Sequence, residues 1–186
     1  VLIVGLGNVG AAYAGVLKYS TRVQAIGYDI NTELVEAIKK DEKHALYGQL
    51  KNVYSENKFE ETISCVLVCM STNRGYNRID ASNITEMLLG LELDKDVPII
   101  IKSAVPIGYC SKLKKDIANP VFYCPEMLRE GETASRDIWI TRHVFLSYDS
   151  SNHVDIGEYI SEIYPNGRNI SRYTFEELET LKLARN

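Results

Sequence analysis

The sequence predicts an α/β fold built on a mostly parallel, doubly wound sheet. Short, continuous apolar runs alternate with helical patterns of roughly ten residues along most of the chain. Such runs are typical of parallel strands, because helices cover both faces of a parallel sheet. A glycine-rich turn also joins the first apolar run to the first helical pattern, as in βαβ units that hold phosphate groups.

The order of the elements follows from hydrophobic periodicity. Strands are expected at Val1–Gly5, Val23–Asp29, 52–54, Ile63–Met70, Val97–Lys102, Val121–Cys124 and His143–Ser147. Helices are expected at Val9–Tyr19, 31–40, Asp80–Leu91, Ile107–Ile117 and Val154–Ile163. Asn31 is the expected amino-terminal cap of the second helix. The segment 174–186 has a helical pattern again, and 41–62 has little pattern of any kind.

The composition is that of a soluble globular protein, with 45% hydrophobic and 25% charged residues among 186. The net charge of −4 disfavours a nucleic-acid partner. The longest apolar stretch, Ile63–Met70, is too short to span a membrane. The four cysteines and three histidines lack disulfide or metal-ligand spacing. We therefore expect a cytoplasmic protein without a metal site, a membrane segment or disulfides.

Both ends of the sequence fall within predicted elements, the first strand and the last helix. We expect one α/β domain over residues 1–170. Residues 171–186 are then the start of a connecting helix that leads to a C-terminal domain absent from this sequence.

The first turn has the pattern Gly5-x-Gly7-x-x-Gly10. The first glycine allows a tight turn, the second lets the backbone approach a pyrophosphate, and the third lets the helix pack close to the sheet. The unpaired N–H groups at the helix start attract phosphate. The motif predicts a dinucleotide site and a Rossmann-like form of the fold.

An acidic residue follows the second strand in the sequence "GYD", 19 residues after Gly10. The carboxylate of Asp29 can accept hydrogen bonds from both ribose hydroxyls, and it would repel a 2′-phosphate. No arginine follows it, since the next residues are Ile30 and Asn31. NAD is therefore the expected cofactor rather than NADP. FAD, a nucleotide sugar or an empty turn are the alternatives.

Four further segments, in their order and spacing, resemble the UDP-glucose/GDP-mannose dehydrogenase family. "KSAVPIG" is similar to the family's K-S-T-x-P-x-G, and "CPEMLREGETASRD" to its [N/S]-P-E-F-L-R-E-G-x-A-x-x-D. "STNRGYNRID" is similar to its T-P-T-N loop, and "KLARN" to its K-x-A-x-N. The resemblance runs from Val1 to Asn186 and is poorest over residues 41–60.

This resemblance implies an NAD-dependent oxidation of the C6 hydroxyl of a nucleotide sugar. An aldehyde forms first, a cysteine captures it, and after a second oxidation water hydrolyses the thioester to the uronic acid. The closeness of residues 100–138 favours UDP-glucose as the substrate and UDP-glucuronate as the product. The resemblance also implies a homodimer, formed by the full-length enzyme through its central helix.

The resemblance also assigns residue roles. It implies catalytic roles for Glu130, Lys182 and Asn186. It implies substrate contacts for Glu126, Met127, Leu128, Arg129, Glu130, Lys182 and Asn186. It implies NAD contacts for Gly5, Gly7, Asn8, Val9, Gly10, Asp29, Ser71, Thr72, Ala104 and Glu130. The spacing agrees, because Glu126 and Glu130 share one side of a helical turn after Pro125, and alcohol oxidation needs a proton acceptor and a cation.

The sequence departs from the family pattern at two positions. Ala104 stands where the family has a threonine whose hydroxyl helps to order the catalytic water, and Ser103 is a candidate to replace it. Ser71 stands where the family has a proline. The family's nucleophilic cysteine lies in a later segment, and none of the four cysteines matches it. We therefore expect the chain to bind NAD and to need residues beyond Asn186 for the oxidation.

Two other functions remain open. One is the cofactor domain of a hydroxyacid dehydrogenase, although such an enzyme has no reason to carry the segment "PEMLREG". The other is a stand-alone NAD-binding module that regulates and performs no chemistry. Ala104 and the missing nucleophile favour the second of these.

Overall fold

The computed structural model describes residues 1–72, 79–127, 134–147 and 154–185. Six strands form one parallel sheet in the order β3-β2-β1-β4-β5-β6. The strands are β1 (Leu2–Val4), β2 (Ile26–Tyr28), β3 (Val53–Tyr54), β4 (Val66–Val68), β5 (Ile99–Ile101) and β6 (Val121–Tyr123). The chain reverses its direction of winding between β1 and β4, so a crevice is expected outside the carboxyl ends of these strands.

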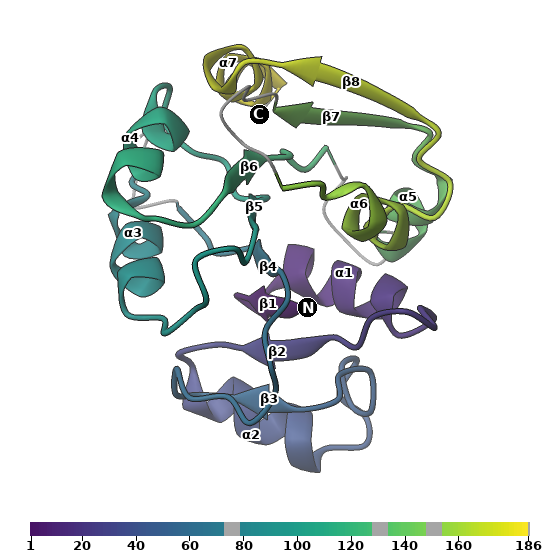
Figure 1. The fold of residues 1–186 in the computed structure, drawn as a ribbon. Helices are drawn as coiled ribbons and strands as arrows, with labels where there is room; N and C mark the ends of the chain where they lie inside the picture. Colours follow the sequence, from purple (N-terminus) through teal and green to yellow (C-terminus); the bar gives the residue numbers. More distant parts are fainter. Residues whose placement is uncertain (73–78, 128–133, 148–153, 186) are drawn as a thin grey trace.

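Helices cover both faces of the sheet. They are α1 (Asn8–Leu17), α2 (Thr32–Lys40), α3 (Ser82–Leu89), α4 (Tyr109–Asp116), α5 (Ala134–Ile140), α6 (Gly157–Ile163) and α7 (Phe175–Arg185). In Figure 1, α3 and α4 lie on one side of the sheet, and α1, α5 and α6 lie on the other. Two hydrophobic cores correspond to these two faces: one contains Tyr13 and Ile160, and the other contains Leu113 and Leu178.

The predicted doubly wound parallel sheet is confirmed, with one strand placed differently. His143–Ser147 forms β7, which pairs in parallel with β8 (Asn169–Tyr173) in a separate two-stranded sheet. The sequence did not predict β8, because its residues "NISRY" are mostly polar and mostly exposed. It did not predict α5 either, since this seven-residue helix buries only Ala134 and Ile138.

Most element boundaries lie within a few residues of those expected. The predicted cap at Asn31 is confirmed, because its side chain accepts a hydrogen bond of 3.1 Å from the backbone N–H of Leu34. The expected division after residue 170 falls inside β8, and the last helix begins at Phe175. Thr174 and Glu177 cap that helix reciprocally through their side chains and backbone N–H groups.

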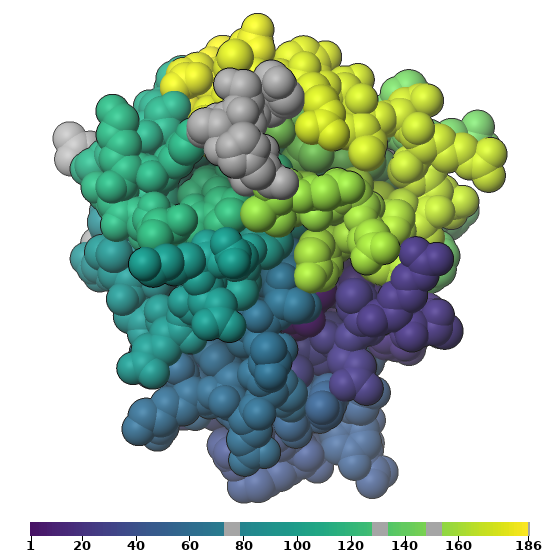
Figure 2. Space-filling model, viewed as in Figure 1, coloured from purple at the N-terminus to yellow at the C-terminus, as the bar shows by residue number. Residues whose placement is uncertain are grey.

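The last elements of the chain and the β3 edge of the large sheet lie at opposite ends of the molecule. The space-filling view shows α7 and β8, in yellow, at the opposite end of the molecule from the blue segment with α2 and β3 (Figure 2).

All four cysteines are free and buried. In the part of the chain that the structure describes, no helix has the length and apolar character needed to cross a membrane.

Candidate functional site

A pocket of about 830 Å³ opens at the carboxyl ends of the central strands. The predicted cofactor residues that line it are Gly5, Gly7, Asn8, Val9, Asp29, Ser71, Thr72 and Ala104. Glu126 and Lys182, from the predicted substrate set, line it as well. The structure therefore brings together residues that are more than 170 positions apart in the sequence, at the crevice that the strand order predicts.

The three motif glycines have different surroundings. Gly5 has a φ of +86°, and a Cβ there would lie 2.9 Å from the carbonyl oxygen of Cys69. A Cβ on Gly10 would lie 1.9 Å from the carbonyl oxygen of Gly5, so this glycine serves close packing and does not line the pocket. A Cβ on Gly7 would meet no protein atom within 4 Å. The space beside Gly7 is therefore open to a ligand.

The start of α1 suits a phosphate group. Gly7 is the cap residue of this helix, no side chain caps its first N–H groups, and its first turn contains no acidic residue. Those N–H groups are free of helical partners and carry the positive end of the helix dipole. Backbone amides beside an open space at Gly7 therefore fit the diphosphate of a dinucleotide.

Asp29 lies directly after β2 at the edge of the pocket. Its Oδ2 accepts a hydrogen bond of 2.8 Å from the backbone N–H of Leu6, and its Oδ1 accepts one of 2.9 Å from that of Asn31. These two bonds fix the carboxylate over the glycine turn. Each oxygen keeps a further acceptor position, which is what the hydroxyls of a ribose require.

The loop after β4 is held by side-chain hydrogen bonds. The hydroxyl of Thr72 donates to the carbonyl oxygen of Ala104 at 2.6 Å, and the amide of Asn83 donates to the carbonyl oxygen of Ser71 at 3.1 Å. The hydroxyl of Ser103 donates to the carbonyl oxygen of Met70 at 2.7 Å. These contacts join the loop after β4 to the loop after β5 at the wall of the pocket.

The segment after β6 differs from the expectation. Residues 124–127 are not helical, so the expected helical turn directly after Pro125 is absent there. Glu126 is buried and still reaches the pocket, whereas Met127 is half-buried and does not line it. Leu128, Arg129, Glu130 and Asn186 lie outside the described residues, and their predicted roles remain predictions.

Lys182 reaches the pocket from α7, which is anchored to α4 by a buried carboxylate. Glu179 accepts hydrogen bonds from the backbone N–H groups of Gly108, at 2.5 Å, and Cys110, at 2.8 Å. The charge of Glu179 and burial together raise the pKa of the Cys110 thiol, with burial the larger cause. Arg185, one turn after Lys182, also lines the pocket.

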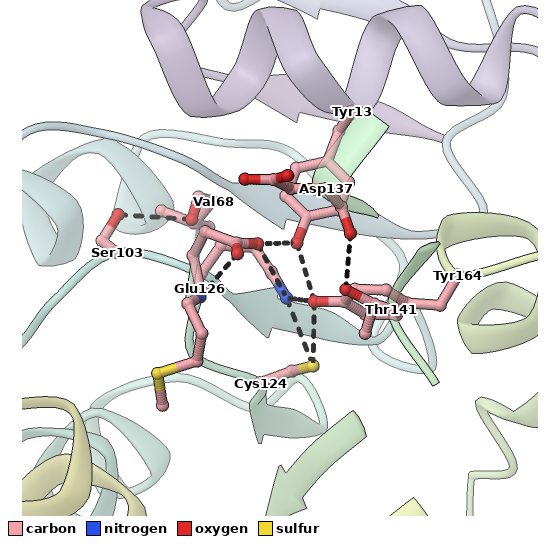
Figure 3. A network of polar contacts seen from close by, with 10 residues as sticks. Tyr13, Val68, Ser103, Cys124, Glu126, Asp137, Thr141 and Tyr164 are labelled. Atoms are coloured by element: carbon pink, nitrogen blue, oxygen red, sulfur yellow. Dashed lines mark hydrogen bonds and ion pairs between the residues drawn. The ribbon is translucent and has the colours of Figure 1, made fainter. Parts of the chain in front are cut away.

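A buried polar network that the sequence did not predict adjoins the pocket (Figure 3). Its centre is Lys102, which is only 1% exposed and follows β5. Its ammonium donates to the hydroxyl of Tyr164 at 2.5 Å and lies 3.9 Å from Oε2 of Glu126. The hydroxyl of Tyr13 donates to the same carboxylate oxygen. The available signal was a lysine directly after the apolar run 97–101.

Burial sets the protonation of the groups around this network. Burial raises the pKa of Tyr13 and of Tyr164 well above the ordinary value, and the negative charge of Glu126 adds to this in both cases. Burial also raises the pKa of Cys69 to about 12. Both phenols and this thiol are therefore neutral at ordinary pH, and the phenols are available as hydrogen-bond donors.

Sequence comparison identifies the family. Residues 1–166 match the profile of the UDP-glucose/GDP-mannose dehydrogenase family, NAD binding domain. The chain belongs to this family. Among curated proteins, it is 27% identical over 203 residues to UDP-glucose 6-dehydrogenase from Campylobacter jejuni, covering all of this chain and 51% of that protein. This UDP-glucose/GDP-mannose dehydrogenase family member thus spans about half the length of that relative.

Solved structures of other proteins share the fold. GDP-mannose dehydrogenase from Pseudomonas aeruginosa has a TM-score of 0.76 and 22% identity, over 98% of this chain and 48% of that one. UDP-D-ManNAc dehydrogenase from Pyrococcus horikoshii has a TM-score of 0.77 and 19% identity, over 98% of this chain and 49% of that one. At these identities the likeness establishes the fold alone.

NAD is the cofactor of the matched domain, and the residues present fit it. The open space at Gly7 and the uncapped start of α1 suit a diphosphate, and the fixed carboxylate of Asp29 suits a ribose without a 2′-phosphate. The cofactor prediction made from the sequence is confirmed. The role of each residue in holding NAD is a proposal.

Proposed function

We propose that this chain is the NAD-binding portion of an enzyme that oxidises the C6 hydroxyl of a nucleotide sugar, with UDP-glucose converted to UDP-glucuronate. One observation carries the proposal: Glu126 and Lys182, an anion and a cation, line the same pocket as the glycine turn and Asp29. NAD bound there supplies a hydride acceptor. The family membership and the curated relative support the nucleotide-sugar class and, within it, UDP-glucose.

In this proposal, the residues of the chain orient the reactants and handle charge. The amides at the start of α1 and the carboxylate of Asp29 fix the cofactor. Lys182 favours negative charge that develops on the substrate oxygen, because a cation in a partly water-excluded site stabilises an alkoxide strongly. Glu126 contacts the substrate, and so do the neighbouring residues Leu128, Arg129 and Glu130, which lie outside the described residues. Glu130 and Asn186 complete the catalytic set.

The covalent step needs a nucleophile that this chain does not supply. Its four cysteines are buried, and burial raises the pKa of Cys65 and Cys69 to about 12, so their thiolates do not form at neutral pH. We therefore propose that the oxidation requires the second half that the curated relative has, and that the full enzyme works as a homodimer.

The test compares substrates and measures both binding and turnover. The chain alone is titrated with NAD and with NADP by calorimetry, and we expect NAD to bind at least tenfold more tightly. The enzyme that contains the chain is then assayed for NADH formation with UDP-glucose, GDP-mannose and UDP-N-acetylmannosamine. Turnover fastest with UDP-glucose supports the proposal. Faster turnover with either of the other two nucleotide sugars would make that sugar the substrate and UDP-glucose the wrong choice. NAD binding without turnover of any of the three supports the regulatory module.

A further inference from the structure

The buried network around Lys102 has a direction that follows from proton counting. The ammonium of Lys102 donates to the hydroxyl of Tyr164, which lies 2.8 Å from the hydroxyl of Tyr13. The hydroxyl of Tyr13 donates its single proton to Oε2 of Glu126, so the proton between the two tyrosines belongs to Tyr164. Every proton along the hydrogen-bonded series from Lys102 through Tyr164 and Tyr13 therefore points toward Glu126.

A chain of donors oriented in one direction stabilises a negative charge at its end, because each bond polarises the next. Lys102 adds a positive charge whose Nζ is 3.9 Å from the same carboxylate oxygen. The other oxygen, Oε1, accepts the backbone N–H of Met127 at 2.5 Å. Both oxygens of Glu126 therefore have protein donors, which restrict its side chain to one orientation.

A purely structural role explains the network poorly. Lys102 has no exposed side-chain area and Glu126 has 8%, and removing two charges from water costs about as much as their attraction returns. Apolar residues of the same size would fill the site with equal or better stability. The pair also lies beneath the pocket that holds the glycine turn, and both members line that pocket.

We infer that Lys102, Tyr13 and Tyr164 are positioning residues that hold the carboxylate of Glu126 in the orientation in which it contacts the substrate. This inference rests on the proposed function, in which Glu126 contacts the sugar nucleotide. The titratable groups that face Glu126 are Tyr13 from α1, Lys102 after β5, Tyr164 at the end of α6, and Cys69 after β4. Cys124 after β6 contacts Lys102 and Tyr164 in turn. Lys102 is the cation among them.

The test uses conservative variants of the enzyme that contains this chain. Tyr13→Phe removes the donor to Glu126, and Lys102→Met removes the cation. Tyr123→Phe is the matched control, because Tyr123 is equally buried in the other hydrophobic core. Each variant is measured for its melting temperature, its NAD dissociation constant, kcat and KM.

We expect Tyr13→Phe to lower kcat at least tenfold, which is the effect of one lost hydrogen bond to a charged group. NAD affinity changes less than about twofold, because the network does not touch the glycine turn. Because kcat falls while NAD affinity is kept, the result separates positioning of Glu126 from a general loss of structure. Tyr123→Phe changes none of these.

Unchanged kcat in folded Tyr13→Phe and Lys102→Met enzymes overturns the inference and leaves the proposed function intact. If Lys102→Met does not fold, Tyr164→Phe replaces it, with a smaller decrease in kcat expected. Absence of turnover in the unsubstituted enzyme with every nucleotide sugar overturns the proposed function, and the inference with it.

Discussion

The carboxylate of Glu179 in α7 accepts a hydrogen bond of 2.5 Å from the backbone N–H of Gly108, the cap residue of α4. Its second oxygen takes the N–H of Cys110. A fully buried carboxylate thereby accepts two N–H groups at the start of α4 and holds α7 against that helix. Lys182, which lines the pocket, belongs to α7.

Replacing this carboxylate is expected to destabilise the fold. Glu179→Ala leaves the buried N–H of Cys110 and the partly buried N–H of Gly108 without this partner, and a buried unsatisfied group costs about 1–3 kcal/mol. We expect a loss of about 2 kcal/mol or more in the free energy of unfolding, measured by urea titration. Glu176→Ala on the same helix is the control, because Glu176 is exposed and its side chain accepts a hydrogen bond from the hydroxyl of Ser111. Equal losses in the two variants would contradict this assignment.

Two of the three glycines of the first turn are expected to respond oppositely to alanine. Gly7→Ala places a methyl group where no protein atom lies within 4 Å. It therefore costs at most about 1 kcal/mol of stability and weakens NAD binding tenfold or more. Gly10→Ala places a methyl group 1.9 Å from a backbone oxygen and destabilises the fold by about 1–3 kcal/mol. Thermal unfolding and NAD calorimetry on both variants separate these effects.

The ion pair of Lys102 and Glu126 is expected to be strongly coupled in the chain alone. Lys102→Met leaves a carboxylate buried without its cation, and we expect a loss of about 3 kcal/mol or more. Glu126→Gln has a comparable cost. The double variant, which buries no charge, should be clearly more stable than the sum of the single losses predicts. Additive losses in urea unfolding would show that the two side chains do not interact.

Stability should decline in alkaline solution because of buried thiols. Burial raises the pKa of Cys65 and Cys69 from 9.0 to about 12. The unfolded chain therefore releases these protons above pH 9, while the folded chain keeps them. The free energy of unfolding is consequently unaffected by these thiols below pH 9 and decreases progressively as the pH rises toward 12. At pH 10 each thiol accounts for about 1 kcal/mol of the loss.

Unfolding free energies measured between pH 8 and pH 11 check this prediction. Cys65→Ala should flatten the decline, and Lys40→Ala, a change at an exposed residue, should not. A decline of the same slope in Cys65→Ala would assign the effect to other groups, such as the buried phenols of Tyr13 and Tyr164.

Local sequence signals predicted the sheet and the cofactor pocket well, because their causes lie close together in the chain. The glycine turn, the apolar runs and Asp29 each depend on short stretches, and parallel strands bring their carboxyl ends to one edge. The elements α5 and β8 gave no such signal. The first buries little, and the second depends on pairing with β7, 26 residues earlier along the chain.

The buried network could not be predicted for a different reason. Tyr13 and Glu126 are 113 residues apart, and Tyr13 and Tyr164 are 151 apart. In the sequence, Tyr13 fits an ordinary core position of a small-residue helix, and Tyr164 fits the end of another helix. What distinguishes them is the hydrogen-bonded series from Tyr164 through Tyr13 to Glu126, and that series is a property of the tertiary packing.

The helix α1 links the glycine turn to the buried network around Glu126. Its first residue, Asn8, adjoins the glycine turn, and Tyr13 lies five residues later on the same rod, a rise of about 7.5 Å. An α-helix transmits axial displacement almost undiminished over so short a span. The same rigid helix therefore supports both the backbone amides beside Gly7 and the phenol that donates to Glu126, so the position of the carboxylate is set from the same framework as the glycine turn.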